Sequence, residues 1–146
     1  MSKLFKIRAA KPDDILAIGN LCSQLGYDVG GESLQRRLDQ ITSDSAQVLR
    51  VATNKQGDVV GWVHALPVCY LEAEIFIEIG GLVVDSSCRR LGIGQALMAA
   101  VEDWAREGGF PTIRLRSNAK RAEAHEFYRR IGYEVVKQQV TFVKDL

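Results

Sequence analysis

One stretch of this chain restricts its fold more than any other: an apolar strand pattern that contains two glycines and leads directly into a helix. Residues 73–84 read as one long strand, and Gly80 and Gly81 lie within it. Glycine inside a strand weakens pairing and commonly marks a bulge or a close backbone approach. After a short polar turn, residues 92–107 place their apolar side chains on one helical face. This order predicts a mixed α/β domain with an irregular strand beside a helix start.

Apolar periodicity along the rest of the chain predicts the other elements. Strands are expected at 4–9, 47–53, 59–68 and 112–116, with one or two closing strands within 133–143. Helices are expected from Pro12 to Gly26, around 34–41 and over 119–131. The order is strand, two helices, three strands, helix, strand, helix and closing strands, which we interpret as a single domain over residues 1–146.

Length, charge and cysteine content exclude several classes of protein. A chain of 146 residues fits one domain with a core that needs no disulfide or metal. The net charge of +1 does not indicate the excess of Lys and Arg that binding to nucleic acid or an anionic membrane requires. Cys22, Cys69 and Cys88 lack a Cys-x-x-Cys spacing and a neighbouring His cluster, which argues against a disulfide framework and a metal site. We therefore expect a reducing, cytoplasmic location, with no signal peptide and no membrane span.

The turn and helix start after the glycine-containing strand have the chemistry of an anion site. The first N–H groups of a helix have no internal partner, and the helix dipole is positive there. Gly92 and Gly94 remove the β-carbons that would keep a pyrophosphate from those amides, and Arg89 and Arg90 add positive charge. For an isolated Gly-x-Gly, the structural alternative is a tight turn with two solvated arginines.

Other nucleotide-binding and hydrolase motifs do not fit. Residues 92–97 contain the first two glycines of G-x-G-x-x-G, but Leu97 occupies the third position, where a small residue lets helix and strand pack closely. The chain also lacks a G-x-x-x-x-G-K-[ST] loop and a G-x-S-x-G elbow. These observations exclude a P-loop nucleotide hydrolase and an α/β-hydrolase.

Two motifs, together with the number of residues that separates them, resemble the GNAT superfamily of acetyl-CoA-dependent N-acetyltransferases. The first, [QR]-x-x-G-x-[GA], corresponds to residues 89–94, and the second to residues 124–128 followed by Gly132 and Tyr133. The resemblance covers most of the chain. It implies the GNAT fold: an α/β protein with a twisted, mostly antiparallel mixed sheet, a splay between strands 4 and 5, and about four flanking helices.

The resemblance also implies a coenzyme site. The backbone at 82–84 would pair with the pantetheine arm of acetyl-CoA, and the amides of 90–95 would bind its pyrophosphate. Asn118 resembles an asparagine that contacts the coenzyme, and Arg121 stands where some relatives place that asparagine. A plain buried strand is the structural alternative for 82–84. The complete set of expected coenzyme-binding residues is Leu82, Val83, Val84, Arg89, Arg90, Leu91, Gly92, Ile93, Gly94, Gln95, Asn118, Arg121 and Phe127.

Two residues are expected to be catalytic. Tyr128 resembles the tyrosine that protonates the departing thiolate, and a phenol with a pKa of about 10 is protonated at neutral pH. Its structural alternative is a core aromatic. Many relatives carry an acidic residue near the positions of Gly80 and Gly81, so we assign the base to Glu78 upstream, with Glu72 and Glu74 on the same strand face. An exposed strand carboxylate is the alternative for Glu78.

The predicted function is transfer of an acetyl group from acetyl-CoA to a primary amine by direct attack. The acceptor is either a small molecule or a protein or peptide amine. Cys69 and Cys88 have no nearby His in the sequence to activate them for a covalent route. The alternative function is a non-catalytic acyl-CoA sensor of the same fold. We expect no metal, no nucleic acid and no membrane partner, and a homodimer formed through 135–143.

Overall fold

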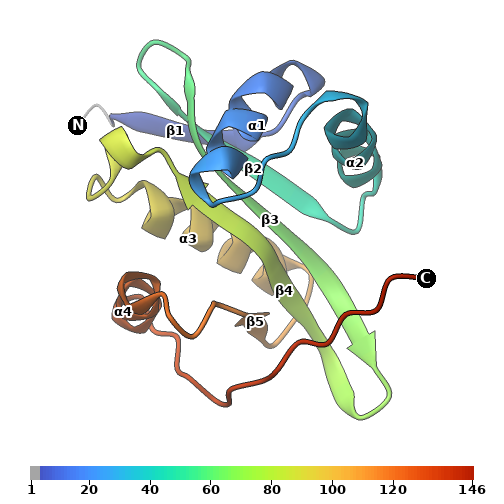
Figure 1. Ribbon diagram of the computed structural model, residues 1–146. Coiled ribbons are helices and arrows are strands. Elements are labelled where there is room, and N and C mark those ends of the chain that lie inside the picture. The colour runs from blue at the N-terminus through green and yellow to red at the C-terminus, as the bar shows by residue number, and fades with distance from the viewer. Residues whose placement is uncertain (1–3) are drawn as a thin grey trace. The chain divides into compact units, whose positions relative to one another are not determined.

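The computed structural model describes residues 4–146, which form two compact units, one ending at Leu115 and the other spanning Arg116–Leu146. The first unit contains most of the regular structure (Figure 1). Its elements are β1 (Phe5–Ala9), the 3-10 turn η1 (Pro12–Asp14), α1 (Ile15–Gln24), α2 (Gly31–Ser43), β2 (Val48–Asn54), β3 (Val59–Tyr70), β4 (Ala73–Val84), the 3-10 turn η2 (Ser86–Cys88), α3 (Ile93–Glu107) and β5 (Ile113–Leu115). The second unit contains α4 (Ala122–Arg130).

The first unit is built on a five-stranded sheet in the order β1-β2-β3-β4-β5. The first three pairs are antiparallel, and β4 and β5 are parallel. The parallel pair requires a crossover connection, which α3 supplies. The mostly antiparallel mixed sheet confirms the fold expected from the sequence.

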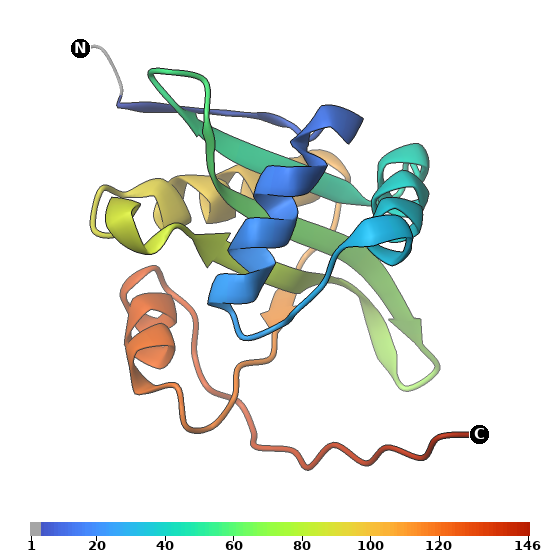
Figure 2. The same ribbon diagram turned by 45° about the horizontal axis from the view of Figure 1, so that its top comes forward.

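Helices cover both faces of this sheet. In Figures 1 and 2, α1 and α2 lie on one face and α3 lies on the other. On the α3 face the chain comes very close at Gly61, where a β-carbon would lie 3.3 Å from Leu97 Cδ1 and 3.1 Å from the Val83 carbonyl oxygen. Leu97, Met98 and Val101 of α3 are almost fully buried against the strands. Burial of this apolar stripe fixes the position of α3, and therefore of its N-terminus.

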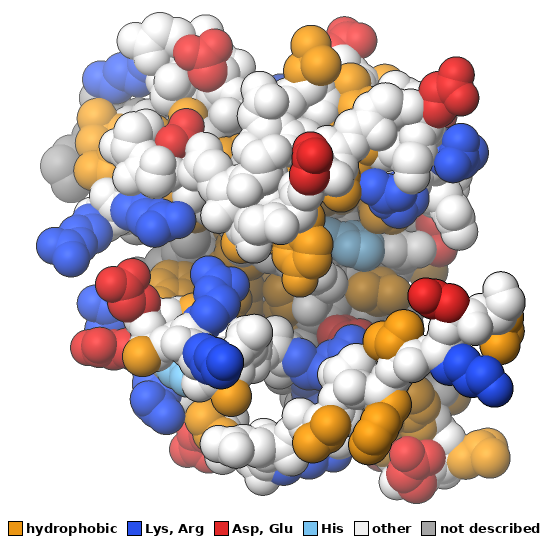
Figure 3. Space-filling view, in the orientation of Figure 1, with side chains coloured by type: hydrophobic (Ala, Val, Ile, Leu, Met, Phe, Trp, Pro, Cys, Tyr) orange, Lys and Arg blue, Asp and Glu red, His pale blue; other side chains and the backbone are white. Residues whose placement is uncertain are grey.

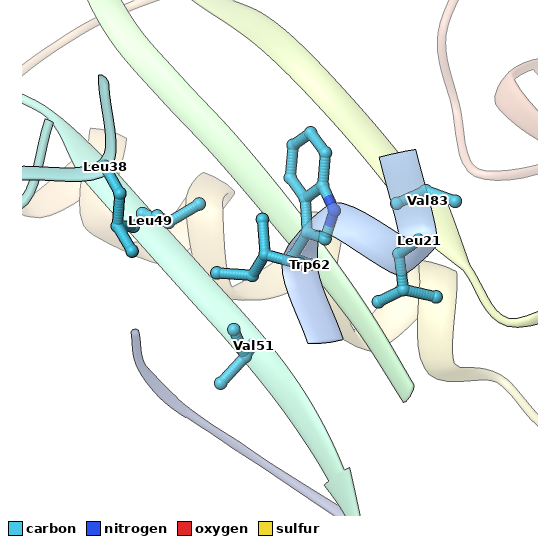
Figure 4. Close-up of a cluster of buried hydrophobic side chains, with 7 residues drawn as sticks. Leu21, Leu38, Leu49, Val51, Trp62 and Val83 are labelled. Carbon is cyan, nitrogen blue, oxygen red and sulfur yellow. The ribbon is translucent and has the colours of Figure 1, made fainter. Parts of the chain in front are cut away.

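The opposite face carries a second apolar cluster, which joins the helices to the middle of the sheet (Figure 4). Trp62 of β3 lies at its centre and is 9% exposed. The cluster consists of Ile18 and Leu21 of α1, Leu38 of α2, Leu49 and Val51 of β2, Trp62, and Val83 of β4. Because these residues come from two helices and three strands, the end of β4 is held by packing against the helices as well as by pairing within the sheet.

A partly buried ion pair fixes the start of α1. Arg8 donates two hydrogen bonds to the Asp14 carboxylate, at 2.8 and 2.9 Å, and the Lys11 amide donates a third at 2.8 Å. Asp14 is 8% exposed, and hydrogen bonding to the Arg8 guanidinium holds the pKa of its carboxyl below the usual value. The sequence signal at Pro12 is therefore satisfied by a 3-10 turn that leads into the helix.

The parallel pairing of β4 and β5 is short. It joins Ile77 to Ile113, Glu78 to Arg114 and Ile79 to Leu115, and β5 ends there. The register between β3 and β4 shifts at the same level, because His64 pairs with Gly81 while Ala65 pairs with Ile79. Gly80 is therefore the extra residue of a bulge on β4. The bulge and the splay between strands 4 and 5, both predicted from the sequence, occur together.

In the second unit, α4 is followed by a segment that differs from the prediction. The sequence pattern predicts one or two strands within 133–143, but none of residues 133–146, all of which are described, is in a strand. A strand forms only when another strand pairs with its backbone groups, and apolar alternation by itself does not provide that partner. Its apolar side chains are instead exposed, with Phe142 at 90%.

Candidate functional site

The connection from β4 to α3 is held by hydrogen bonds from three directions. The Asp85 amide donates to the Val60 carbonyl at 2.8 Å, which extends the pairing with β3. The Ser86 amide donates to Gln24 Oε1 at the end of α1 at 2.9 Å. The Asp85 carboxylate accepts from the Ser87 amide at 3.1 Å and caps η2. The turn before α3 is therefore a defined structure and not a loose loop.

The N-terminus of α3 presents free backbone donors. The first hydrogen bond within the helix is donated by the Ala96 amide to the Gly92 carbonyl, at 3.0 Å. No side chain among the described residues caps this end. The amides of Ile93, Gly94 and Gln95 precede that bond, so they are positioned to donate to an anion at the positive end of the helix dipole.

Two residues just before α3, Arg90 and Gly92, have a left-handed backbone conformation. Gly92 has φ 84°, and Arg90 has φ 67°, which is uncommon for a residue with a side chain. A β-carbon at Gly92 would have no neighbour within 4 Å among the described residues. The sequence predicted that Gly92 clears space for a ligand. The structure adds that its positive φ is a separate reason for glycine.

The expected coenzyme-binding residues of the first unit differ in exposure, and three of them, Leu82, Val84 and Gly94, are half-buried. Arg89, Arg90, Leu91, Gly92 and Gln95 are exposed at the helix start. The side chains of Ile93 and Val83 are 3% and 4% exposed and belong to the core. Ile93 and Val83 can therefore contribute to a ligand site only through their backbone groups.

The end of β4 has one paired edge and one released edge. On one side Leu82, Val83 and Val84 pair with Val63, Trp62 and Gly61 of β3. On the other side the ladder with β5 stops at Ile79. Residues 80–84 therefore keep backbone donors and acceptors on the β5 side for another extended group. This edge leads without a break to the turn and to the start of α3.

Gly80 and Gly81 are required by side chains that reach across from β3. A β-carbon at Gly80 would lie 2.6 Å from His64 Nδ1, and one at Gly81 would lie 2.6 Å from the Trp62 ring. Both distances are shorter than real contacts, so an added side chain would displace these rings. His64 is not among the residues that the sequence pattern assigned to the site. Only the strand register brings it to the bulge.

Glu78 lies just before the bulge. It pairs with Leu66 on β3 and with Arg114 on β5, and it is half-buried. Since directly paired residues project on the same face of a sheet, Glu78 shares the α1 and α2 face with His64. It is one position before the level at which β4 separates from β5.

The second unit contains the other four expected site residues. Asn118 begins the turn before α4: its carbonyl accepts from the Arg121 amide at 3.0 Å, and its side chain accepts from the Lys120 amide at 2.9 Å. His125 Nε2 bonds the same carbonyl at 2.9 Å. Arg121 is the N-cap residue of α4. Asn118 is therefore engaged in shaping the helix start.

Tyr128 lies in an aromatic group on α4. Its ring packs edge-on against Phe127, with centroids 5.1 Å apart, and against Tyr133 at 6.1 Å. Burial raises the pKa of the Tyr128 phenol, and the positive charge of Arg121 opposes that shift. The phenol is consequently protonated at neutral pH and available as a proton donor.

Among residues 4–146, no group of three or more His, Cys, Asp or Glu side chains is arranged to hold a metal ion. Within the same residues, no helix is long and apolar enough to cross a membrane. The features that remain are a released strand edge and a helix start with free amides and two arginines. These features of the α/β fold have the chemistry to accept a phosphate-bearing ligand with an extended arm.

Comparison with known proteins identifies the family. A profile of the acetyltransferase (GNAT) family matches residues 17–133, so the chain belongs to this family of acetyl-CoA-dependent N-acetyltransferases. Aminoglycoside N(6')-acetyltransferase type 1 from Stenotrophomonas maltophilia is 28% identical over 140 residues, which cover 93% of this chain and 90% of that protein. The aminoalkylphosphonate N-acetyltransferase of Salmonella typhimurium is 38% identical over 81 residues, covering 55% of this chain and 53% of that protein.

A solved structure agrees with the fold. AAC(6')-Iy in complex with the bisubstrate analog CoA-S-monomethyl-acetylneamine matches with a TM-score of 0.86 and 17% sequence identity, covering 97% of this chain and 99% of that chain. At this identity the match concerns the fold. It supports the GNAT architecture that the two sequence motifs predicted.

Proposed function

We propose that this protein transfers the acetyl group of acetyl-CoA to a primary amine by direct attack, without a covalent acyl-enzyme. The observation that carries the proposal is the continuous path formed by the released edge of β4 at 80–84 and the uncapped start of α3. An extended arm with amide groups fits the strand edge, and a pyrophosphate fits the helix amides with Arg89 and Arg90.

Different residues of the chain have different roles in the proposed reaction. Bound acetyl-CoA supplies the acetyl group and a thiolate leaving group. The amides of 93–95 orient the pyrophosphate, and the backbone of 82–84 orients the arm. Tyr128 donates its proton to the departing sulfur, and its raised pKa keeps that proton in place beforehand. Asn118, Arg121 and Phe127 are the further coenzyme contacts that the resemblance to the family implies.

A covalent route through Cys22 has little physical support. Burial raises the pKa of the Cys22 thiol, and Arg37 only partly opposes the shift. A nucleophilic cysteine needs the opposite change, since the thiolate is the reactive form. Direct attack requires instead that a base remove a proton from the amine. Glu78, half-buried beside the bulge, is the carboxylate that the sequence assigns to this step.

A small polar amine is the acceptor that we favour. The two named relatives acetylate an aminoglycoside and an aminoalkylphosphonate according to their names, and both are small amines. Figure 3 shows Lys and Arg side chains interspersed with Asp and Glu on the face that it presents. Such a mixed surface does not select a highly charged polymer. A lysine or N-terminal amine of a peptide is the other acceptor class to be tested.

The decisive experiment measures thiol release from acetyl-CoA with sisomicin, 2-aminoethylphosphonate and a lysine-containing peptide as acceptors. We expect acceptor-dependent release with a small amine, and a loss of about 100-fold in kcat for Tyr128→Phe. Tyr27→Phe removes the same hydroxyl from an exposed position on the first unit and serves as the control. Coenzyme binding by calorimetry without release to any acceptor would favour the alternative function, an acyl-CoA sensor.

We also propose a homodimer formed through the C-terminal segment. This segment has the apolar alternation of a strand but forms no strand. It exposes six apolar side chains: Val135, Val136, Val140, Phe142, Val143 and Leu146. A second copy would give these residues a partner and cover them. Sedimentation should show a dimer for the wild type and a monomer for Phe142→Asp. A wild-type monomer at micromolar concentration would contradict this proposal.

A further inference from the structure

His64 lies across the bulge in β4. The register places it opposite Gly81, next to the extra residue Gly80. Its Nδ1 and Cε1 atoms are 2.6 and 3.2 Å from the point where a β-carbon of Gly80 would lie. The Nδ1 edge of the ring therefore occupies the space that a side chain at 80 would fill. Gly80 is exposed and His64 is partly exposed, so the Nδ1 edge borders an accessible position at the point where β4 leaves β5.

The other ring nitrogen of His64 is held by a chain of polar groups from the start of β2. His64 Nε2 is 2.7 Å from Gln47 Oε1, and Gln47 Nε2 donates to Asp44 Oδ2 at 3.0 Å. The Asp44 carboxylate also accepts from the Ala46 amide at 2.9 Å, and its hydrogen bonds lower its pKa. An ionised carboxylate only accepts hydrogen bonds, so Gln47 turns its NH₂ group toward Asp44 and its carbonyl oxygen toward the imidazole.

This chain determines which nitrogen of His64 carries the proton. A carbonyl oxygen is an acceptor, so Nε2 must donate to Gln47, and the neutral ring then has its lone pair on Nδ1. The lone pair lies on the edge of the ring that borders Gly80. Burial lowers the pKa of His64, so the ring is neutral and able to accept a proton at neutral pH.

Burial is the cause of the pKa shift of His64. The elements on this side of the sheet and beside it also carry charged and titratable side chains. They lie on β4, β5, α1, α2 and the turn before β2. The groups are Glu78, Arg114, Cys22, Glu32, Arg36, Arg37, Asp39 and Asp44. Among them Asp44 is connected to the imidazole by hydrogen bonds through Gln47, at the side away from the bulge.

We propose that His64, through Nδ1, takes the proton from the acceptor amine, with Asp44 and Gln47 as positioning residues. The inference rests on the proposed function, because it needs the acetyl group to lie at the bulge. The β4 edge runs from the α3 end back to Gly80, so an arm bound along 82–84 directs its acyl end toward this ring. As the amine nitrogen bonds to the acetyl carbon, its proton moves to Nδ1, the carbon–sulfur bond breaks, and Tyr128 protonates the thiolate.

The first test compares His64→Gln and Glu78→Gln with the wild type in thiol release with sisomicin and 2-aminoethylphosphonate. We expect His64→Gln to lower kcat by about 100-fold while the calorimetric affinity for coenzyme A changes less than threefold. Gln47→Leu should give a smaller loss, and Gln56→Leu, an exposed glutamine in the turn after β2, is its matched control. The acid limb of kcat/KM should follow the titration of His64 and disappear in His64→Gln.

Three outcomes separate this inference from the proposed function. If the wild type transfers acetyl and His64→Gln does so equally well, only the base assignment is wrong. If Glu78→Gln alone abolishes transfer, the base is Glu78 and the inference is again overturned. If the wild type binds coenzyme A but acetylates no acceptor, the proposed function fails and the assignment to His64 fails with it.

A second measurement does not depend on activity. Nitrogen NMR of the His64 ring reports which nitrogen is protonated. We expect the proton on Nε2 in the wild type and a mixture of tautomers in Gln47→Leu. A proton found on Nδ1 in the wild type would overturn the inference, even if His64→Gln lost activity because of a packing defect.

Discussion

The two ends of β4 form one continuous strand and yet serve different purposes. From Ala73 to Ile79 the strand enters the sheet interior, where Ile77 is fully buried and pairs with both β3 and β5. From Gly80 to Val84 it pairs with β3 alone, and its other edge is released. The change takes place at one inserted residue, Gly80. An edge with unpaired backbone groups is obtained here by ending a neighbouring strand early, while the buried half keeps the sheet intact.

The paired end should determine stability, and replacing its most buried side chain is expected to have the largest effect. Ile77→Ala should lower the free energy of unfolding by about 3 kcal/mol, because it removes buried methyl groups and leaves a cavity. Urea denaturation measures the change. Ile75→Ala, on the same strand but 40% exposed, is the matched control and should cost much less. Equal losses for both variants would remove the contrast within the paired end.

The released end should determine coenzyme binding. Gly94→Glu places a carboxylate where the pyrophosphate is proposed to bind, and we expect coenzyme A affinity to fall by about 10- to 100-fold. Stability should hold, since an acidic residue in the first turn interacts favourably with the helix dipole. Ala99→Glu, exposed further along α3, is the control. Unchanged affinity of Gly94→Glu in calorimetry would contradict the placement of the pyrophosphate.

The boundary between the two ends should be sensitive to a single methyl group. Gly81→Ala would bring a β-carbon to 2.6 Å from the Trp62 ring, which belongs to the apolar cluster. Overpacking of this kind costs about 1–3 kcal/mol. Thermal unfolding should show the loss. Gly30→Ala is the control, because an added β-carbon there has nothing within 4 Å among the described residues and the backbone is extended, with φ 174°.

The smallest expected effect concerns the dependence of stability on pH. Burial lowers the pKa of folded His64 below its ordinary value of 6.5. As the pH falls through that value, the unfolded chain binds a proton before the folded one, so stability decreases, by at most about 1.4 kcal/mol per pH unit. This slope should be reduced in His64→Gln, measured by urea denaturation between neutral and mildly acidic pH. An unchanged slope would show that His64 titrates normally in the folded protein.

Much of this molecule could be predicted from local patterns. The predicted strand over 73–84 has the same bounds in the structure, and the predicted helix over 92–107 begins one residue later. Both patterns are strong because apolar side chains recur with the period of their own element. The uncapped start of α3 was also predictable, since a helix start and its free amides are local features. The strand pattern at 133–143 failed because pairing depends on a partner that periodicity does not reveal.

Residues that meet through strand register could not be predicted in this way. Gln47 and His64 are 17 positions apart, and Asp44 lies outside any strand. The order of elements, the glycine interruption and the helix start with free amides could all be predicted from the sequence, since each follows from neighbouring residues. The three-dimensional structure was needed to show where β4 leaves β5, why two glycines are needed there, and which imidazole nitrogen borders the opening. These depend on side chains that cross between strands, and no local pattern contains that information.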